Sequence, residues 1–496
     1  MKVPNLQKAG RFLLAPGQEL FGELSLGGSK TLLHLHSPAE FATHFGPNQY
    51  ITGVLNDLVK VSLIDCVTAP LPARGSRNGE QYYIADSFPH FVVFGDGHIA
   101  PDQNVVAKIH FAVDDATALF YDFDAFGFLV DAGPIIETVT SAVALTRGRE
   151  IAVGPNPQVL YFSGKSEIFS VDTVLGKVSA SHNPKLTSWG GPSGVGLVNT
   201  ILLTVEFKES VVFPESMAAV STLLRYLEIV AGRPQNLVSL SLSVDGETTP
   251  TTLHVYWAMC PGREPRDEWE KPHPADVLLD AVRKRDEFCQ VLQNWLNREQ
   301  LWRNARLRFS SCFAKQNHYD IDRLVGAANM FDILEPPAVP PATLLSDELE
   351  AAKKISRDAF KATPHSPERH DVLIALKRMG TPNLKRKIRH RVSKVEGATG
   401  TLFPDLSTVT DEAVNCRNFY VHGAEASFDY GQNSDLPRFF TDALEFVFAA
   451  SDLIEAGWDV NGWASKGTSM THGFGRFLVD YKRQLMCLKA LLLGTE

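Results

Sequence analysis

The chain has 496 residues, of which 44% are hydrophobic and 21% are charged, a composition that excludes an intrinsically disordered protein. This length predicts two or three domains. No stretch is apolar enough to cross a membrane, and the N-terminus lacks the apolar core of a signal peptide. The six cysteines show no zinc-binding spacing, so we expect reduced thiols in a cytoplasmic protein.

The formal charge of −9 is unevenly distributed along the chain. The first 260 residues carry 16 Lys and Arg against 24 Asp and Glu, whereas the remainder carries 32 against 33. A polyanionic partner such as RNA would therefore have to bind a local basic patch in the second half, because the chain as a whole repels it.

The first 260 residues are predicted to form a β-rich domain. Residues 21–26 and 31–36 flank a Gly-Gly-Ser-Lys turn, and residues 51–66 repeat the hairpin pattern around Asn56-Asp57. A helix is expected over residues 214–231, where Gly232 ends it. Further strands are expected at residues 91–94, 105–113, 159–162, 196–207, 237–244 and 251–259.

After a linker rich in proline and charge at residues 261–275, the apolar residues recur at helical spacing. We therefore expect an α+β multidomain protein, with the β-rich domain (1–260) followed by an all-α helical bundle (276–496). The expected helices cover residues 277–296, 301–313, 321–334, 348–360, 372–379, 384–392, 409–422, 436–456 and 474–493.

One helical segment carries residues suited to cleaving RNA without a metal. A histidine such as His422 can move protons near neutral pH, and the planar fork of Arg417 can hold phosphate charge. Asn418 can orient either group. Gly423 predicts the end of this helix. Because Arg417 and His422 lie about 140° apart around a helix, we expect that one helix cannot close both on one phosphate and that the site is shared across a dimer.

The loose pattern of an arginine followed by four to six residues and a histidine is weak evidence alone. It occurs twice in this chain, and the other copy, Arg266 to His273, falls in the linker. Only the copy from Arg417 to His422 adds a helical setting, an adjacent asparagine and a glycine after the histidine.

Arg417-Asn418-Phe419-Tyr420-Val421-His422 resembles the R-N-x-x-x-H motif of the HEPN superfamily. The β-rich domain with its early Gly22-Glu23-Leu24 hairpin, followed by helices, resembles the ApeA-type anti-phage defence proteins. The resemblance implies an all-α HEPN-like bundle of four to five helices that dimerises and cleaves RNA without metal or cofactor, arresting the growth of infected cells. It also implies Arg417, Asn418 and His422 as the catalytic residues.

Three alternatives remain open at the level of sequence. Arg417 could be buried against helix-terminal carbonyls, with His422 as a cap and no catalytic role. The HEPN-like domain could bind nucleotide or RNA without cleaving it. The protein could also be an interaction module whose β-rich domain binds peptide or glycan.

Residues 384–394 form the densest basic stretch. Leu384, Ile388 and Val392 would anchor a helix, which would leave the cations outward as a groove for RNA or as an ordinary solvated face. These cations are Lys385, Arg386, Lys387, Arg389 and Arg391. A weaker cluster of Arg303, Arg306 and Arg308 is expected at the surface, and no clustered metal ligands are evident.

The combined prediction is a cytoplasmic, metal-independent endoribonuclease of abortive infection. Its partners would be single-stranded RNA loops, a second copy bound through the HEPN-like domain, and a phage-derived trigger sensed by the β-rich domain. Attack by the 2′-hydroxyl would give 2′,3′-cyclic phosphate and 5′-hydroxyl ends.

Overall fold

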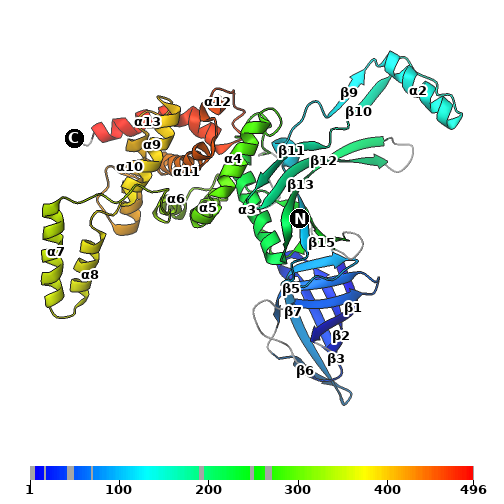
Figure 1. The fold of residues 1–496 in the computed structure, drawn as a ribbon, viewed down its shortest axis with the longest axis horizontal. Coiled ribbons are helices and arrows are strands. Elements are labelled where there is room, and N and C mark those ends of the chain that lie inside the picture. The colour runs from blue at the N-terminus through cyan, green and yellow to red at the C-terminus, as the bar shows by residue number, and fades with distance from the viewer. Residues whose placement is uncertain are drawn as a thin grey trace. The chain divides into compact units, whose positions relative to one another are not determined.

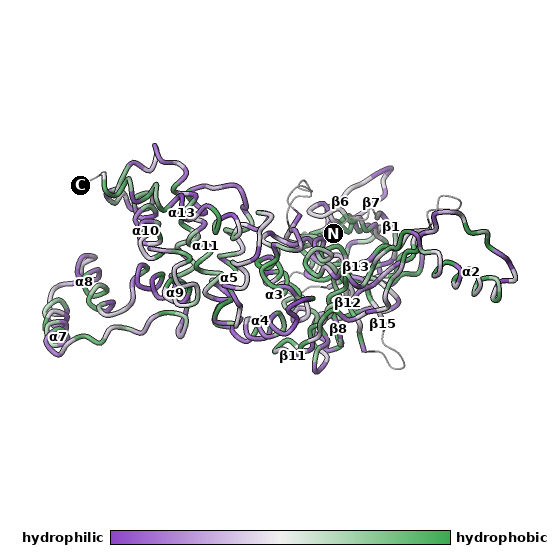
Figure 2. The backbone as a smooth tube through the Cα atoms, turned by 90° about the horizontal axis from the view of Figure 1, so that it is seen from above, coloured by the Kyte–Doolittle hydropathy of each residue, from purple (hydrophilic) through white to green (hydrophobic). Residues whose placement is uncertain are grey.

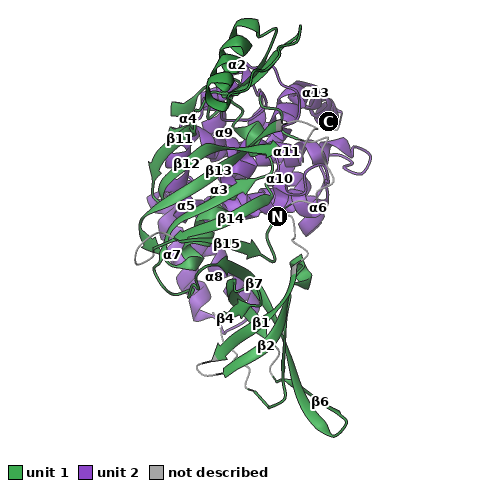
Figure 3. Ribbon diagram, turned by 90° about the vertical axis from the view of Figure 1, so that its right-hand side faces the viewer, with its two compact units in different colours: residues 1–224, 235–274, 280–289 green, residues 225–234, 275–279, 290–496 purple. Residues whose placement is uncertain are grey.

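The computed structural model describes residues 6–15, 18–41, 50–68, 71–188, 195–245, 251–262 and 271–494. The chain divides into two compact units, shown in Figure 3. Unit 1 holds residues 1–224, 235–274 and 280–289, and unit 2 holds residues 225–234, 275–279 and 290–496. Unit 1 is rich in strands and the C-terminal region is helical, as the sequence predicted.

The N-terminal strands of unit 1 close into an antiparallel barrel. The strands follow the order β7-β3-β2-β1-β4-β5, and β5 pairs again with β7 to complete the circle. Both predicted hairpins are present, with Phe21 opposite His36 and Ile51 opposite Leu63. Leucine and phenylalanine side chains fill the barrel. The bounds are β1 (Leu6–Ala15), β2 (Gln18–Leu26), β3 (Leu32–Ser37), β4 (Tyr50–Leu55), β5 (Lys60–Thr68) and β7 (Glu80–Gly95).

The long strand β7 also borders an open antiparallel sheet, whose order is β11-β12-β13-β8-β14-β15-β7. The predicted helix at residues 214–231 is present as α3 (Phe213–Ala231) and is followed by Gly232 at a positive φ of 80°. The remaining bounds are β6 (Ala73–Arg77), which pairs with β7, β8 (Val106–Val113), α1 (Ala116–Leu119), β11 (Glu167–Thr173), β12 (Gly176–Ser188), β13 (Val195–Val211), β14 (Leu237–Val244) and β15 (Thr251–Trp257).

A projecting arm of unit 1 was only partly predicted. It consists of β9 (Phe126–Val130), α2 (Gly133–Arg147) and β10 (Gln158–Phe162), of which only β10 was expected (Figure 1). No residue of α2 is buried, although Figure 2 shows that hydrophobic residues recur along it. Ile135, Ile136, Val139 and Val143 share one side of this helix, a spacing that the sequence analysis did not single out.

The helices of the C-terminal region match the expected segments with two differences. Val277, Leu278 and Leu279 are buried but not helical, and the first helix begins only at Arg285. The short helix α12 was not expected. The bounds are α4 (Arg285–Asn297), α5 (Glu299–Phe313), α6 (Ile321–Asp332), α7 (Asp347–Ala362), α8 (Pro367–Arg378), α9 (Leu384–Thr399), α10 (Leu406–His422), α11 (Asp435–Ala456), α12 (Val460–Ala464) and α13 (Gly473–Leu493).

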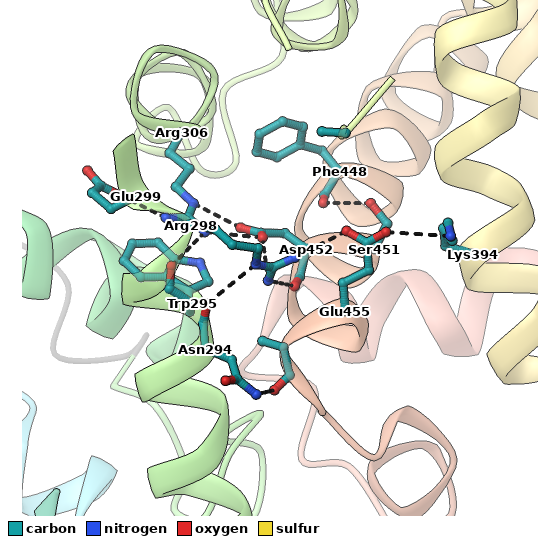
Figure 4. Close-up of polar contacts among 12 residues, drawn as sticks. Asn294, Trp295, Arg298, Glu299, Arg306, Lys394, Phe448, Ser451, Asp452 and Glu455 are labelled. Atoms are coloured by element: carbon teal, nitrogen blue, oxygen red, sulfur yellow. Dashed lines mark hydrogen bonds and ion pairs between the residues drawn. The ribbon is translucent and has the colours of Figure 1, made fainter. Parts of the chain in front are cut away.

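A buried ionic network connects α5, α9 and α11, as Figure 4 shows in part. Asp452 accepts two hydrogen bonds from Arg306, at 2.9 and 3.1 Å, and forms a 2.8 Å ion pair with Arg298. Glu455 accepts two more from Arg391 of α9, at 3.1 and 2.9 Å. The expectation that Arg306 lies at the surface was wrong: its side chain is 1% exposed because Asp452 and Glu299 neutralise it.

Candidate active site

Helix α10 carries the predicted motif at its C-terminal end. Val409, Ala413 and Cys416 recur at three- and four-residue steps and are fully buried, and α10 packs against α6, α9 and α11. Gly423 adopts a left-handed conformation with a φ of 63° directly after the last helical residue. The predicted end of the helix is therefore confirmed, and His422 occupies its last turn.

Arg417 contacts both of the other predicted catalytic residues. Nη1 of Arg417 lies 3.0 Å from Nε2 of His422 and also donates to Oδ1 of Asn418 at 3.0 Å. Since a guanidinium can only donate, Nε2 must offer its lone pair, which places the imidazole proton on Nδ1. This neutral form of His422 is the one that can accept a proton.

Arg417 and His422 contact each other although their positions lie about 140° apart around the helix. The 140° angle describes the directions of the two Cβ atoms, and the two residues are only about 7.5 Å apart along the axis. The long arginine side chain spans this separation across the last turn. This contact joins the two side chains without a phosphate between them, so a site shared across a dimer stays a prediction.

The purely architectural interpretation of Arg417 predicts contacts to helix-terminal carbonyls. Backbone N–H groups bind those carbonyls instead: Gly423 donates to Phe419 at 3.0 Å and Ala424 donates to Asn418 at 3.4 Å. Among the described residues, no carboxylate lies within ion-pair distance of Arg417, and its buried Nε has no hydrogen-bond partner. The guanidinium charge is thus not neutralised within this part of the chain and can attract an anion.

Sequence reasoning missed a fourth polar residue of the site, Asn329 of α6. Its Oδ1 lies 3.5 Å from Nη2 of Arg417, so this amide helps to orient the fork from a second helix. The two residues are 88 positions apart, and a lone asparagine between Ala328 and Met330 gives no local signal for such a role.

The neighbouring cysteine can be excluded as the nucleophile. Cys416 is fully buried, and burial raises the pKa of its thiol to about 12, so the reactive thiolate is suppressed. Next to it, burial also raises the pKa values of Tyr420 and Tyr430. Phe419 lies three residues before His422 on α10, and 37% of its surface is exposed to solvent.

The basic stretch of α9 is less available than the sequence indicated. Lys385 donates to Asn415 at 2.7 Å, Lys387 lies 3.8 Å from Asp332, and Arg389 forms a bidentate pair with Asp411. Arg386 alone of the predicted cations has no side-chain partner among the described residues and is half-exposed.

Arg391 is removed from the predicted RNA-binding set. It is fully buried, three residues after Ile388 on the inward side of α9, and Glu455 and Ser451 bind its guanidinium. The helical pattern placed Ile388 and Val392 inside correctly, but burial of a cation on the same face depends on Glu455, which is distant in sequence.

Arg266, in the other copy of the arginine–histidine pattern, lies outside the described residues. In the described part of the chain, no group of three or more His, Cys, Asp or Glu side chains could hold a metal ion.

Comparison with protein families gave two matches. The family described as ApeA N-terminal domain 1 matches residues 7–295, more than half of the chain, and the family described as Apea-like HEPN matches residues 327–461. The chain belongs to the ApeA-type family. The HEPN match contains Asn329, α9 and the whole of α10, and thus every residue of the Arg417 site. No curated protein and no solved structure matched the chain.

ApeA-type proteins with a HEPN domain are a defence-related nuclease family, and HEPN domains are generally associated with RNase activity and commonly dimerise. The N-terminal match extends through the linker into α4, beyond the boundary at residue 260 that the sequence analysis placed. No helix among the described residues is long and apolar enough to span a membrane.

Proposed function

We propose that this ApeA-type protein is a metal-independent endoribonuclease that cleaves RNA when a phage infects the cell. The observation that carries the proposal is the 3.0 Å contact between Arg417 and His422, with no carboxylate partner for the arginine among the described residues. Cleavage by the 2′-hydroxyl requires a group that transfers protons and a cation that stabilises the charge on the phosphate. The exposed imidazole can serve as the first, and the adjacent guanidinium as the second.

In the proposed reaction, Arg417 binds nonbridging phosphate oxygens, and Nη1 then no longer donates to Nε2 of His422. The freed lone pair accepts the proton of the ribose 2′-hydroxyl. O2′ bonds to phosphorus, the bond from phosphorus to O5′ breaks, and the imidazolium returns the proton to the leaving oxygen. Asn418 and Asn329 orient the guanidinium throughout.

The same proposal assigns the other parts of the chain. The β-rich domain, residues 1–260, would sense a phage-derived trigger and restrain the nuclease, and residues 261–275 would link it to the HEPN domain, residues 276–496. The active protein would be a cytoplasmic homodimer formed through its HEPN domains. Single-stranded loops are the expected substrates, because unpaired nucleotides let O2′ align with the phosphate.

Product analysis tests this chemistry directly. We expect cleavage of a single-stranded RNA to persist in EDTA and to leave 2′,3′-cyclic phosphate and 5′-hydroxyl ends, whereas the same sequence in DNA stays intact. A 5′-phosphate product would contradict the mechanism, because it requires attack by water. Binding of RNA without any cleavage would instead favour the alternative of a non-enzymatic RNA-binding module.

The role of α9 is tested at Arg386, the one cation of the predicted set that has no side-chain partner within the described part of the chain. Arg386→Glu is expected to weaken RNA binding and to lower the salt slope of the binding constant by about 0.7 to 0.9. Cleavage at saturating RNA should be retained, since Arg386 does not touch the Arg417 site. Arg483→Glu, on the exposed face of α13, is the matched control. Equal salt slopes for both variants would show that α9 is only a solvated helix.

A further inference from the structure

Helices α7 and α8 form a hairpin that projects from the helical unit (Figure 1). Ser346 and Ser366 cap the starts of the two helices, and the Arg369 guanidinium donates to the carbonyls of Phe360 and Lys361 at the end of α7. These hydrogen bonds cap the two helices and fix the turn between them. No residue of either helix is buried. Because these residues are not part of the core, their side chains are accessible to a binding partner.

The basic residues of α7 gather on one side of the helix. Lys353, Arg357 and Lys361 follow at intervals of four, which places them along one side, and Lys354 lies next to them. The opposite side carries small and apolar residues, among them Ala352, Ile355 and Ala359. From residue 353 to the end of the helix, the one carboxylate is Asp358, which lies four residues after Lys354 at the edge of this side.

Three of the four cations on this side of α7 have no side-chain partner among the described residues, whereas four of the five predicted cations of α9 have one. Among the described residues, no side-chain hydrogen bond or ion pair occupies Lys354, Arg357 or Lys361, and all three are exposed. Lys353, the fourth cation on this side, is held by Glu350, at 3.7 Å, and by the Met379 carbonyl, at 3.5 Å. These three exposed cations of α7 were not singled out by the sequence, which indicated α9 instead.

We propose that the basic ridge of α7, formed by Lys354, Arg357 and Lys361, binds the phosphate backbone of the substrate RNA away from the cleaved bond. A regular row of exposed, flexible cations matches a polyanionic strand, and contacts to phosphates alone carry no base preference. The four carboxylates of α7 offset its four cations over the whole helix, so attraction of RNA depends on the local row of the three cations without partners among the described residues. The inference rests on the proposed function and extends its substrate to strands long enough to reach the hairpin.

The test compares short and long single-stranded RNAs in the full chain. The triple variant Lys354→Ala, Arg357→Ala and Lys361→Ala keeps good helix formers at exposed positions, so the hairpin should stay folded. On a long RNA we expect weaker binding, a salt slope reduced by about 2 and a raised KM with unchanged kcat. A short oligonucleotide that cannot span to α7 should be bound and cleaved as by the wild type.

The control replaces three charges on the same hairpin without touching the ridge: Asp347→Ala, Glu348→Ala and Glu368→Ala should not weaken binding to the long RNA. Equal affinity of the wild type and the ridge variant for long RNA would overturn the proposal and leave α7 to a protein partner. Binding is measured without turnover, so a wild-type protein that binds long RNA through the ridge but never cleaves would refute the nuclease and not the ridge.

Discussion

Replacing His422 by alanine is expected to lower the single-turnover rate of RNA cleavage by roughly 100- to 10,000-fold, the usual contribution of a general acid–base group. Arg417→Ala should cost about 100- to 1,000-fold, because it removes the donors that hold charge on the phosphate. Arg417→Lys should recover little of this loss, since an ammonium keeps the charge but not the planar fork.

The thermal midpoint should hardly change in these variants. His422 is exposed, and Arg417 has no carboxylate among the described residues that its removal would leave uncompensated. The linker residues give the matched control, because Arg266→Ala and His273→Ala remove the same pair of residue types from the other copy of the pattern. Unfolding of both site variants would support an architectural role for the motif, and lost cleavage in the linker variants would mean that the wrong copy was chosen.

The parts of this protein that sequence predicted well are those set by neighbouring residues. The two N-terminal hairpins, the helix before Gly232 and the end of α10 at Gly423 each depend on a local turn or cap. Likewise, three residue types within six positions of α10 indicated the site, because helix geometry keeps such residues near one another.

The parts that sequence missed depend on contacts between distant positions. Asn329 joins the site across 88 residues, and Arg306 and Arg391 are interior only because Asp452 and Glu455 stand opposite them on α11. Composition assigns an arginine to the surface by default, and only a tertiary partner reverses that assignment. The contact between Arg417 and His422 was missed for a different reason, since the angle between two helix positions ignores the reach of the side chains.

Asp452→Ala is expected to give the largest loss of stability, roughly 3–5 kcal/mol of the free energy of unfolding of the helical unit. Asp452 is 1% exposed and faces two arginines, of which Arg306 is also 1% exposed. Without the carboxylate, Arg306 keeps Glu299 at 2.8 Å and the Trp295 carbonyl at 3.1 Å, but two of its hydrogen bonds are lost and its Nε is left without an acceptor in an environment that excludes water. Urea titration followed by far-ultraviolet circular dichroism measures the change.

Asp480→Ala supplies the comparison, because Asp480 pairs with Arg483 at 3.2 Å at the surface, and such pairs contribute between about 0 and 1 kcal/mol. Asp452 does not contact Arg417, so below the melting transition the folded Asp452→Ala protein should cleave RNA at nearly the wild-type rate. Stability and cleavage should therefore separate in opposite ways at the two places, with His422→Ala stable and inactive and Asp452→Ala unstable and active. If Asp452→Ala unfolded no more easily than Asp480→Ala, the buried network would not hold α5 against α11, and the bundle that presents α10 would have to draw its stability from apolar packing alone.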